Sequence, residues 1–243
     1  MVGKRPGDSA GPKTQKKKKT DNYQDGECGF LVTGASCQNA LRGTKDLRLW
    51  LEVEAEQSPA SASVSSTLPA ASAKQQTSAS EGLEAELAEL KGGPDARRFL
   101  AVGMVCKEVA FLRAQHAGDV PSHLASQILG RSAPRPFASR FAERILPVDV
   151  SSRPKQEAFC AAAVSLLRPH IGRTWKLVYE PFRGGWNTIS KEDALAVCKT
   201  TLLAENLSVN DPEVTVICTV NPRFVGLSVI KLEDVEDLRV AAD

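Results

Sequence analysis

The spacing of apolar residues predicts strands and helices in the first half of the chain. Residues 28–33 form a short continuous apolar run, which is typical of a buried strand, and Ser36 after it is a candidate helix cap. The leucines of residues 47–54 fit both a strand and a helix. We predict a helix there because Glu, Lys, Arg and Leu dominate the segment and β-branched residues are scarce. A second strand is predicted at 98–105 and a second helix at 119–129.

The second half of the chain has a denser and more regular pattern. Pro154 suits the first position of a helix that ends near Leu167, and residues 175–179 alternate as a strand does. Residues 190–193 resemble a capping box, which opens another helix. Two strands follow, an alternating one at 214–220 and a continuously apolar one at 224–230. The order strand, helix, strand, helix, strand, strand describes an α+β module of roughly 100 residues.

Two stretches contain too few apolar residues to bury a core. Residues 1–25 combine Gly, Pro, Lys and Asp, and residues 57–81 are of low complexity, with Ser and Ala at 14 of 25 positions. We predict disorder in both because neither can offset the entropy of ordering. The predicted division is therefore a tail at 1–25, an N-terminal domain at 26–130 with the insert at 57–81, a second domain at 131–233 and a C-terminal tail at 234–243.

The motif inventory excludes most enzyme classes. The chain has three histidines and six widely spaced cysteines, and none of them stands at the spacing of a metal site. Phosphate-loop, dinucleotide-binding, zinc-deaminase and serine-hydrolase motifs do not occur. No run approaches 18 apolar residues and the N-terminus lacks a secretory signal, so we expect no membrane span and reduced thiols. We therefore expect no catalytic residue, no metal and no cofactor.

Charge distinguishes a strongly basic tail from a modestly basic second half. Residues 1–25 hold seven Lys or Arg against three Asp, and Lys16, Lys17, Lys18 and Lys19 form a run that suggests nuclear targeting or RNA contact. A merely solubilising tail is the alternative for this run. Residues 132–231 hold 13 Lys or Arg against nine Asp or Glu, an excess that is compatible with RNA binding without requiring it.

One loop combines the groups that bind phosphates and stacked bases. Residues 183–187 supply a cation, an aromatic ring and an amide directly before the N-terminus of a predicted helix. Arg140 and Arg144 are four residues apart, so on a helix they would share a face. The candidate RNA-binding residues are Arg140, Arg144, Arg173, Lys176, Arg183, Trp186, Asn187 and Lys191.

The alternative is an ordinary solvated surface. In that case Trp186 packs inward and the arginines pair with Glu143, Asp149 or Glu180. Composition alone does not decide between the two interpretations.

A series of motifs in the second domain carries a resemblance to a known family. The motifs are residues 140–148 (RFAERILPV), 175–180 (WKLVYE), 187–193 (NTISKED), 210–216 (NDPEVTV) and 226–229 (GLSV). In this order they resemble the THUMP domain of the eukaryotic adaptor family of tRNA cytidine acetylation. Residues 29–33 (GFLVT) resemble the opening strand of that family, downstream of a basic tail. The resemblance covers the last hundred or so residues closely and the hundred before them loosely.

The resemblance implies a ferredoxin-like N-terminal domain packed on a THUMP domain, which together grip the acceptor stem and 3′ end of tRNA. In the family the adaptor is not the catalyst. A separate RNA cytidine acetyltransferase, which uses ATP and acetyl-CoA, makes N4-acetylcytidine in the D-arm of serine and leucine tRNAs. For this chain the resemblance implies a tRNA-binding partner of that enzyme, located in the nucleus, the nucleolus included, and partly in the cytoplasm.

The candidate loop departs from the family, and two other functions stay open. The family has a basic residue followed by two asparagines where this chain has residues 183–187. The chain could serve another tRNA-modification enzyme, since THUMP domains are also fused to methyltransferases, pseudouridine synthases and thiouridine synthetases. It could instead be a nuclear interaction scaffold without direct RNA contact.

Overall fold

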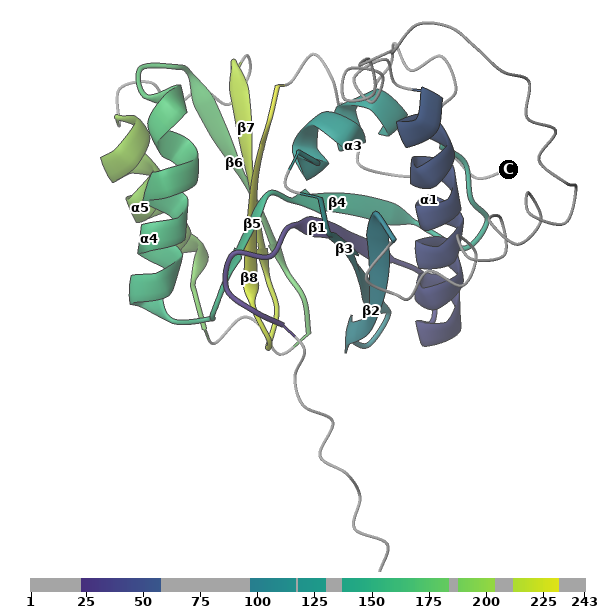
Figure 1. Cartoon of the computed structure of the whole chain (residues 1–243). Helices are drawn as coiled ribbons and strands as arrows, with labels where there is room; N and C mark the ends of the chain where they lie inside the picture. Colours follow the sequence, from purple (N-terminus) through teal and green to yellow (C-terminus); the bar gives the residue numbers. More distant parts are fainter. Residues whose placement is uncertain are drawn as a thin grey trace, which may run out of the picture.

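The computed structural model describes residues 23–57, 97–116, 118–129, 137–183, 188–203 and 212–231. These residues fold into two packed units, each with a four-stranded sheet (Figure 1). Among them, no helix is long and apolar enough to cross a membrane. The run Lys16–Lys19, the insert from residue 58 onward and the C-terminal tail at 234–243 lie outside the described residues. The mixture of helices and strands agrees with the predicted α+β class.

In the part of the chain that the structure describes, the N-terminal unit has the order strand, helix, strand, strand, helix, strand. Its sheet runs β2-β3-β1-β4, and every neighbouring pair is antiparallel. The elements are β1 (Gly29–Thr33), α1 (Cys37–Gln57), β2 (Phe99–Cys106), β3 (Val109–Ala114), α3 (Pro121–Leu129) and β4 (Arg144–Val148). Ser36 Oγ accepts a hydrogen bond from the Asn39 N–H at 3.2 Å, as expected of a helix cap. The predicted strands and helices of this half are confirmed, and β3 and β4 are additional strands. The predicted boundary at residue 130 is wrong, because β4 pairs with β1 and so belongs to the N-terminal unit.

Side chains alternate between the two faces of this sheet. Phe30 faces the helices and belongs to the same buried cluster as Leu47 of α1 and Ile128 of α3. Phe111 of β3 faces the other way and packs against Phe224 of the C-terminal unit, with the ring centroids 5.2 Å apart. One face of the sheet is therefore covered by its own helices and the other by the second unit.

The C-terminal unit has a mixed sheet that runs β5-β8-β7-β6. β6 and β7 are parallel, and the chain between them includes the crossover helix α5. The elements are β5 (Val150–Ser152), α4 (Gln156–Leu167), a short 3-10 helix (Arg168–His170), β6 (Trp175–Pro181), α5 (Lys191–Leu202), β7 (Val214–Val220) and β8 (Val225–Ile230). The predicted elements are confirmed with one correction. α4 begins at Gln156 with Lys155 at the N-cap position, so Pro154 precedes the helix instead of opening it.

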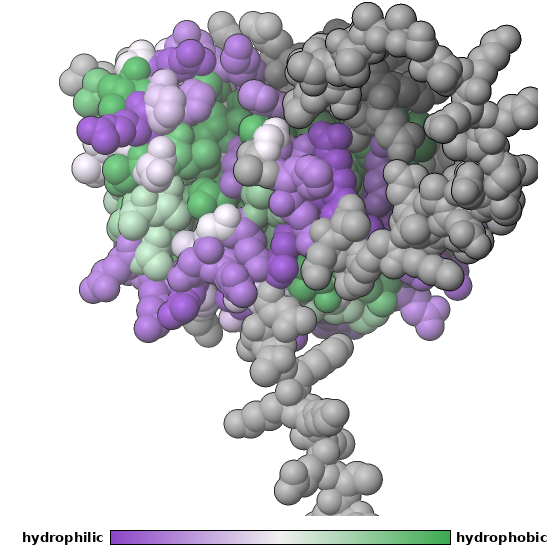
Figure 2. Space-filling view, viewed as in Figure 1, coloured by the Kyte–Doolittle hydropathy of each residue, from purple (hydrophilic) through white to green (hydrophobic). Residues whose placement is uncertain are grey.

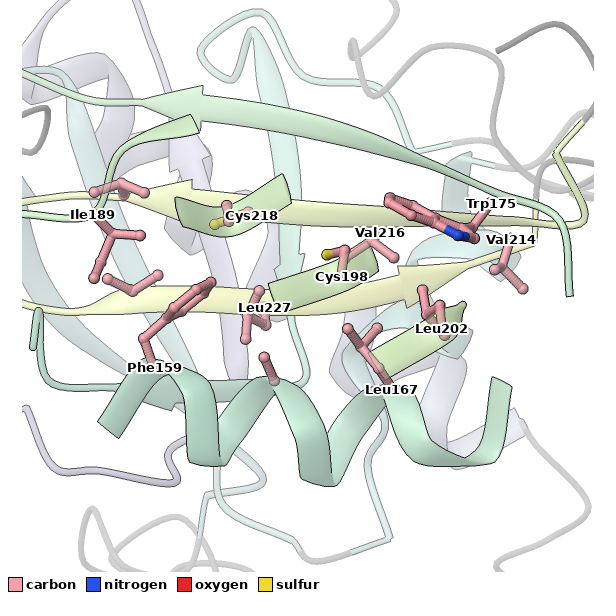
Figure 3. Close-up of a cluster of buried hydrophobic side chains, with 14 residues drawn as sticks. Phe159, Leu167, Trp175, Ile189, Cys198, Leu202, Val214, Val216, Cys218 and Leu227 are labelled. Carbon is pink, nitrogen blue, oxygen red and sulfur yellow. The ribbon is translucent and has the colours of Figure 1, made fainter. Parts of the chain in front are cut away.

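Two helices cover one face of the C-terminal sheet and enclose its core (Figure 3). Phe159 and Leu167 point from α4 toward the sheet, and Leu202 of α5 lies near Trp175 of β6. All four side chains are fully buried. The Trp175 indole N–H donates to the Leu203 carbonyl at 3.3 Å, so the polar atom of this large side chain is satisfied.

The strand β4 of the N-terminal sheet continues through Asp149 into β5 of the C-terminal sheet and so joins the two units (Figure 1). Its last residue, Val148, packs on Gly226 of β8, where a Cβ atom would lie 2.8 Å from the Val148 side chain, so glycine permits this approach. The Asp149 carboxylate then accepts hydrogen bonds from the N–H of Ser122 in α3 at 2.8 Å and of Val229 in β8 at 3.2 Å. Burial raises the pKa of Asp149. These contacts join the two units into a single packed body.

The folded region begins three residues earlier than predicted. The Tyr23 ring centroid lies 5.4 Å from that of Phe224 and 6.0 Å from that of Phe111. Asp25 forms an ion pair with Arg153 at 3.1 Å. Residues 23–25, predicted as the end of the tail, therefore belong to the fold, because Tyr23 supplies apolar surface that the composition of the tail as a whole obscures.

Candidate nucleic-acid interface

Arg144 is paired with a carboxylate across the two units. It begins β4, so the predicted helical face shared with Arg140 is wrong. Its two terminal nitrogens donate to Glu180 of β6, from Nη1 to Oε2 at 3.1 Å and from Nη2 to Oε1 at 2.8 Å. Such a bidentate pair fixes both side chains. The alternative interpretation, an arginine paired with Glu180, therefore holds for Arg144.

Arg140 and Arg42 both contact the ring of Phe141. The guanidinium carbon lies 4.8 Å from the ring centroid for Arg140 and 5.3 Å for Arg42, which comes from α1. Both arginines are exposed. Stacking on an aromatic ring orients a guanidinium and leaves its N–H groups able to donate to a phosphate.

Arg183 is exposed two residues beyond the end of β6. The N–H of Phe182 donates to the Val220 carbonyl at 2.7 Å, which fixes the start of this loop beside the end of β7. Trp186 and Asn187, the other two predicted residues of the loop, lie outside the described residues.

Lys191 is exposed at the first position of α5, next to the predicted capping box, which is confirmed. Ser190 Oγ accepts a hydrogen bond from the Asp193 N–H at 3.0 Å, and the Asp193 carboxylate accepts one from the Ser190 N–H at 3.1 Å. The Ser190 hydroxyl also donates to the Asp193 carboxylate at 2.8 Å, and this hydrogen bond and the one from the Ser190 N–H lower the pKa of Asp193. A carboxylate already lies at this helix terminus, so the terminus itself is a poor site for a phosphate.

Arg173 and Lys176 lie at the opposite end of β6 from Arg183. The seven residues of β6 separate its two ends by about 20 Å. Lys176 is half-buried and lies on the face of the sheet opposite Trp175, because neighbouring strand residues point to opposite faces. The predicted RNA-binding residues therefore do not form a single patch.

One end of the molecule, where β1 and β6 end and β4 begins, collects basic side chains from both units. We call it the cationic end and define it by Arg42, Lys107, Arg140, Arg144, Arg183 and Arg223. The same segments carry the acidic residues Glu108, Glu143 and Glu180, which leaves a formal excess of three positive charges. Sequence reasoning missed Arg42, Lys107 and Arg223 because only the tertiary fold brings these distant segments together.

Direct contacts hold the segments of the cationic end in place. The N–H of Glu143 donates to the last carbonyl of β1 at 2.9 Å, and the N–H of Gly34 donates to the Glu108 carbonyl at 3.1 Å. Arg223 lies in the turn between β7 and β8, and its guanidinium carbon is 5.3 Å from the Tyr23 ring centroid. The cationic end is therefore a composite of both units with a fixed geometry.

The surface over α4 differs from the cationic end. The helix has one charged side chain, Glu157, and Val164 is 46% exposed. Viewed as in Figure 1, hydrophobic residues gather on the left, where α4 and α5 lie, and hydrophilic ones line the lower edge (Figure 2). A polyanion is therefore better matched by the cationic end than by the surface of α4.

The half-buried thiol of Cys106 and the buried thiols of Cys198 and Cys218 have low reactivity. Burial raises the pKa of Cys106 to about 11 and that of Cys198 to about 12, and it raises the pKa of Cys218 as well. These thiols are protonated at neutral pH, so none of them is an activated nucleophile. Among the described residues, no group of three or more His, Cys, Asp or Glu side chains could hold a metal ion.

Comparison with known proteins gives only distant similarities. No model of a protein family matches the chain, and no curated protein matches it. Among solved structures, it is similar to PH1313 from Pyrococcus horikoshii, with 7% identity and a TM-score of 0.36 over 65% of this chain and 53% of that one. It is also similar to a 4-thiouridine synthetase in complex with RNA and bound ATP, with 10% identity and a TM-score of 0.36 over 84% of this chain and 42% of that one. The chain thus spans about half or less of the length of these two proteins.

Proposed function

We propose that this chain binds tRNA in the service of tRNA modification, with a ferredoxin-like domain and a THUMP domain as its two units. Its specific role in this proposal is that of an adaptor. It presents serine and leucine tRNAs to a separate RNA cytidine acetyltransferase, which forms N4-acetylcytidine in the D-arm. The observation that carries the RNA-binding role is the cationic end, to which both units supply arginines. The acetylation role rests on the sequence motifs.

The topology supports the proposed domain assignment. A βαββαβ order with the antiparallel sheet β2-β3-β1-β4 is the arrangement of ferredoxin-like domains. The motifs that resemble the family include β4, β6, the cap of α5 and portions of β7 and β8. They therefore lie on the C-terminal sheet, on its crossover helix and on β4, which leads into that sheet.

The chemistry of the cationic end suits structured RNA. Structured RNA is recognised through its phosphates, its shape and the stacking of bases, and arginine donates in a planar fork that matches a phosphate. Arg42, Arg140 and Arg183 are exposed, and none of them has a carboxylate partner among the described residues. Arg144 contributes by holding the two units together, not as a free donor.

The RNA-binding role is tested by two matched triple variants. Arg42→Ala/Arg140→Ala/Arg183→Ala removes three positive charges from the cationic end. Its control removes three exposed charges from the opposite end of the C-terminal sheet, at Arg168, Lys199 and Lys231. A charged hydrogen bond to phosphate is worth roughly 1.5–3 kcal/mol, so we expect the first variant to bind tRNA at least tenfold more weakly and to melt near wild type. A greater loss in the control would place the interface at the other end, near Arg173.

The adaptor role has its own tests. Deletion of the protein from cells should remove N4-acetylcytidine from the D-arm of serine and leucine tRNAs, and the loss of a different tRNA modification instead would favour another partner enzyme. Absence of tRNA from RNA recovered with the protein would favour the scaffold alternative.

The chain has no catalytic role, cofactor or metal in this proposal. The purified protein should therefore form no acetylcytidine with ATP, acetyl-CoA and tRNA alone. Its expected location, the nucleus with the nucleolus and partly the cytoplasm, rests on Lys16–Lys19 and on the family resemblance, and fluorescence microscopy of a variant with four Gln at these positions tests it.

A further inference from the structure

The aromatic ring of Phe141 holds two arginines. Arg140, its neighbour in the chain, has its guanidinium carbon 4.8 Å from the ring centroid, and the guanidinium carbon of Arg42 in α1 lies 5.3 Å from the same point. The ring is half-buried, and both arginines are exposed. Two guanidiniums from distant segments of the chain are therefore held close together around one ring at the surface.

Contacts with α1 fix the segment that carries this ring. The Ser139 hydroxyl accepts a hydrogen bond from the Phe141 N–H at 3.2 Å and donates one to the Asp46 carboxylate of α1 at 2.9 Å. Ala142 packs on Gly43 of α1, where a Cβ atom would lie 2.8 Å from the Ala142 side chain, so glycine permits this approach. The ring therefore has a fixed position relative to the helix.

The charges around the ring favour an anion. In the part of the chain that the structure describes, neither Arg42 nor Arg140 takes part in an ion pair. Asp46, one turn after Arg42, is bound to the Ser139 hydroxyl, and Glu143 is exposed. Two positive charges this close repel each other, and an anion beside both removes that repulsion. The planar fork of donors on each guanidinium matches the oxygens of a phosphate.

We propose that Phe141 is a positioning residue that holds Arg42 and Arg140 as a clamp for the phosphates of one RNA strand. This inference rests on the proposed RNA-binding function and deepens it. A freely rotating arginine loses side-chain entropy when it binds a ligand, whereas stacking on a fixed ring orders both guanidiniums beforehand. Phe141 needs no contact with RNA in this arrangement, because it acts through the two cations.

The test removes the ring without removing a charge. Phe141→Leu and Phe141→Met keep an apolar side chain without an aromatic face, and Phe141→Trp keeps the face and is the matched control. Each substitution is made in the natural chain and in an Arg42→Ala/Arg140→Ala variant, and urea unfolding checks that every protein folds. The proteins are titrated with tRNA and, separately, with inorganic pyrophosphate, while NMR follows the arginine Nε–H groups.

We expect Phe141→Leu to weaken tRNA binding roughly three- to tenfold in the natural chain, because each arginine must then be ordered on binding. The same substitution should have no further effect where both arginines are already Ala. Phe141→Trp should bind tRNA as tightly as the natural chain does. Pyrophosphate should shift the Nε–H resonances of Arg42 and Arg140 with a single dissociation constant.

Three results would contradict the clamp and leave the proposed function standing. The first is a folded Phe141→Leu variant with unchanged affinity for tRNA. The second is a loss of affinity that persists where both arginines are Ala, since Phe141 would then act through the fold alone. The third is a pair of different dissociation constants for the two arginines, or no response of either to pyrophosphate. If both arginines respond to pyrophosphate but the natural chain does not bind tRNA, the RNA-binding function is refuted and the clamp belongs to a soluble phosphate compound.

Discussion

At the residue scale, Arg144 was predicted to contact RNA, but in the structure it forms a bidentate pair with Glu180. The side chains are 33% and 26% exposed, so solvent screens the pair only in part. Because the pair bridges β4 and β6, removing one partner leaves the other partly buried without its charge partner. Its first role is therefore structural.

Reversing the pair separates the structural role from RNA contact. Arg144→Glu should lower the free energy of unfolding by about 1 kcal/mol or more, since it places two carboxylates together, and the double variant Arg144→Glu/Glu180→Arg should recover most of that loss. Urea denaturation of the four proteins of this cycle measures the coupling. The double variant keeps the net charge of the cationic end, so its affinity for tRNA should stay within about threefold of wild type. A double variant that is stable and yet binds as weakly as Arg144→Glu would show that the guanidinium itself contacts RNA.

At the element scale, helix α5 owes its sharp start to the reciprocal bonds of Ser190 and Asp193. Ser190→Ala removes the hydroxyl that accepts the Asp193 N–H and should lower the free energy of unfolding by about 1 kcal/mol. The Ser190 hydrogen bonds depress the pKa of Asp193 in the folded chain, so the stabilisation by the ionised carboxylate is complete above the unfolded pKa of about 4 and is lost as the pH falls through the folded value. The difference between wild type and variant should therefore be constant near neutral pH and shrink in acid.

Urea unfolding followed by circular dichroism at several pH values measures this difference. Lys199→Ala on the same helix is the control, because Lys199 is exposed and does not belong to the cap. A cap contribution that persists unchanged well below pH 4 would contradict the assigned bonding of Asp193.

The elements that can be predicted from the sequence are those with local signals. The cap of α5 and the alternation of β6 and β7 depend on residues close in sequence, so the prediction needs no knowledge of the fold. β3 is apolar on both faces because helices cover one side and the C-terminal unit the other, which leaves no alternation to detect. β4 contains Pro147, which argues against a strand until β4 is known to lie at the edge of its sheet.

The candidate site is less predictable than the fold, because it depends on contacts between residues that are distant in the sequence. Local sequence identifies Arg140 and Arg183, but their distances from Arg42 and Arg223 depend on how the two units pack against each other. Sequence reasoning groups Arg173 and Lys176 with them, whereas the strand between them and Arg183 separates its two ends by about 20 Å. Local patterns therefore provide candidate cations, and only the packing of the units selects among them.

At the scale of the whole molecule, the two units are joined by an apolar cluster, by the Asp149 carboxylate and by the Arg144–Glu180 pair. Phe224 contributes to the cluster from the C-terminal unit and is 3% exposed, and it contacts Tyr23 and Phe111 from the N-terminal unit. An RNA-binding surface composed of both units requires this junction, because the distance between an arginine of one unit and an arginine of the other is fixed only while the units stay packed. We therefore expect the described units to unfold together.

A substitution deep in one unit tests this cooperativity in the other. Leu202 is fully buried in the core between α5 and the C-terminal sheet (Figure 3). Helix α5 and β1 lie on opposite sides of that sheet (Figure 1). Leu202→Ala should destabilise the protein by about 2–5 kcal/mol through reduced burial and the cavity left behind. If the junction couples the units, the slowest-exchanging amides of β1 and β7 should lose protection by the same factor in hydrogen exchange, since both exchange only through global unfolding.

Ile128→Ala, in the core of the N-terminal unit, is the reciprocal control and should accelerate exchange in β7 as much as in β1. Loss of protection in β7 alone after Leu202→Ala would mean that the units unfold independently, and a tRNA site shared between them would then lack a rigid frame.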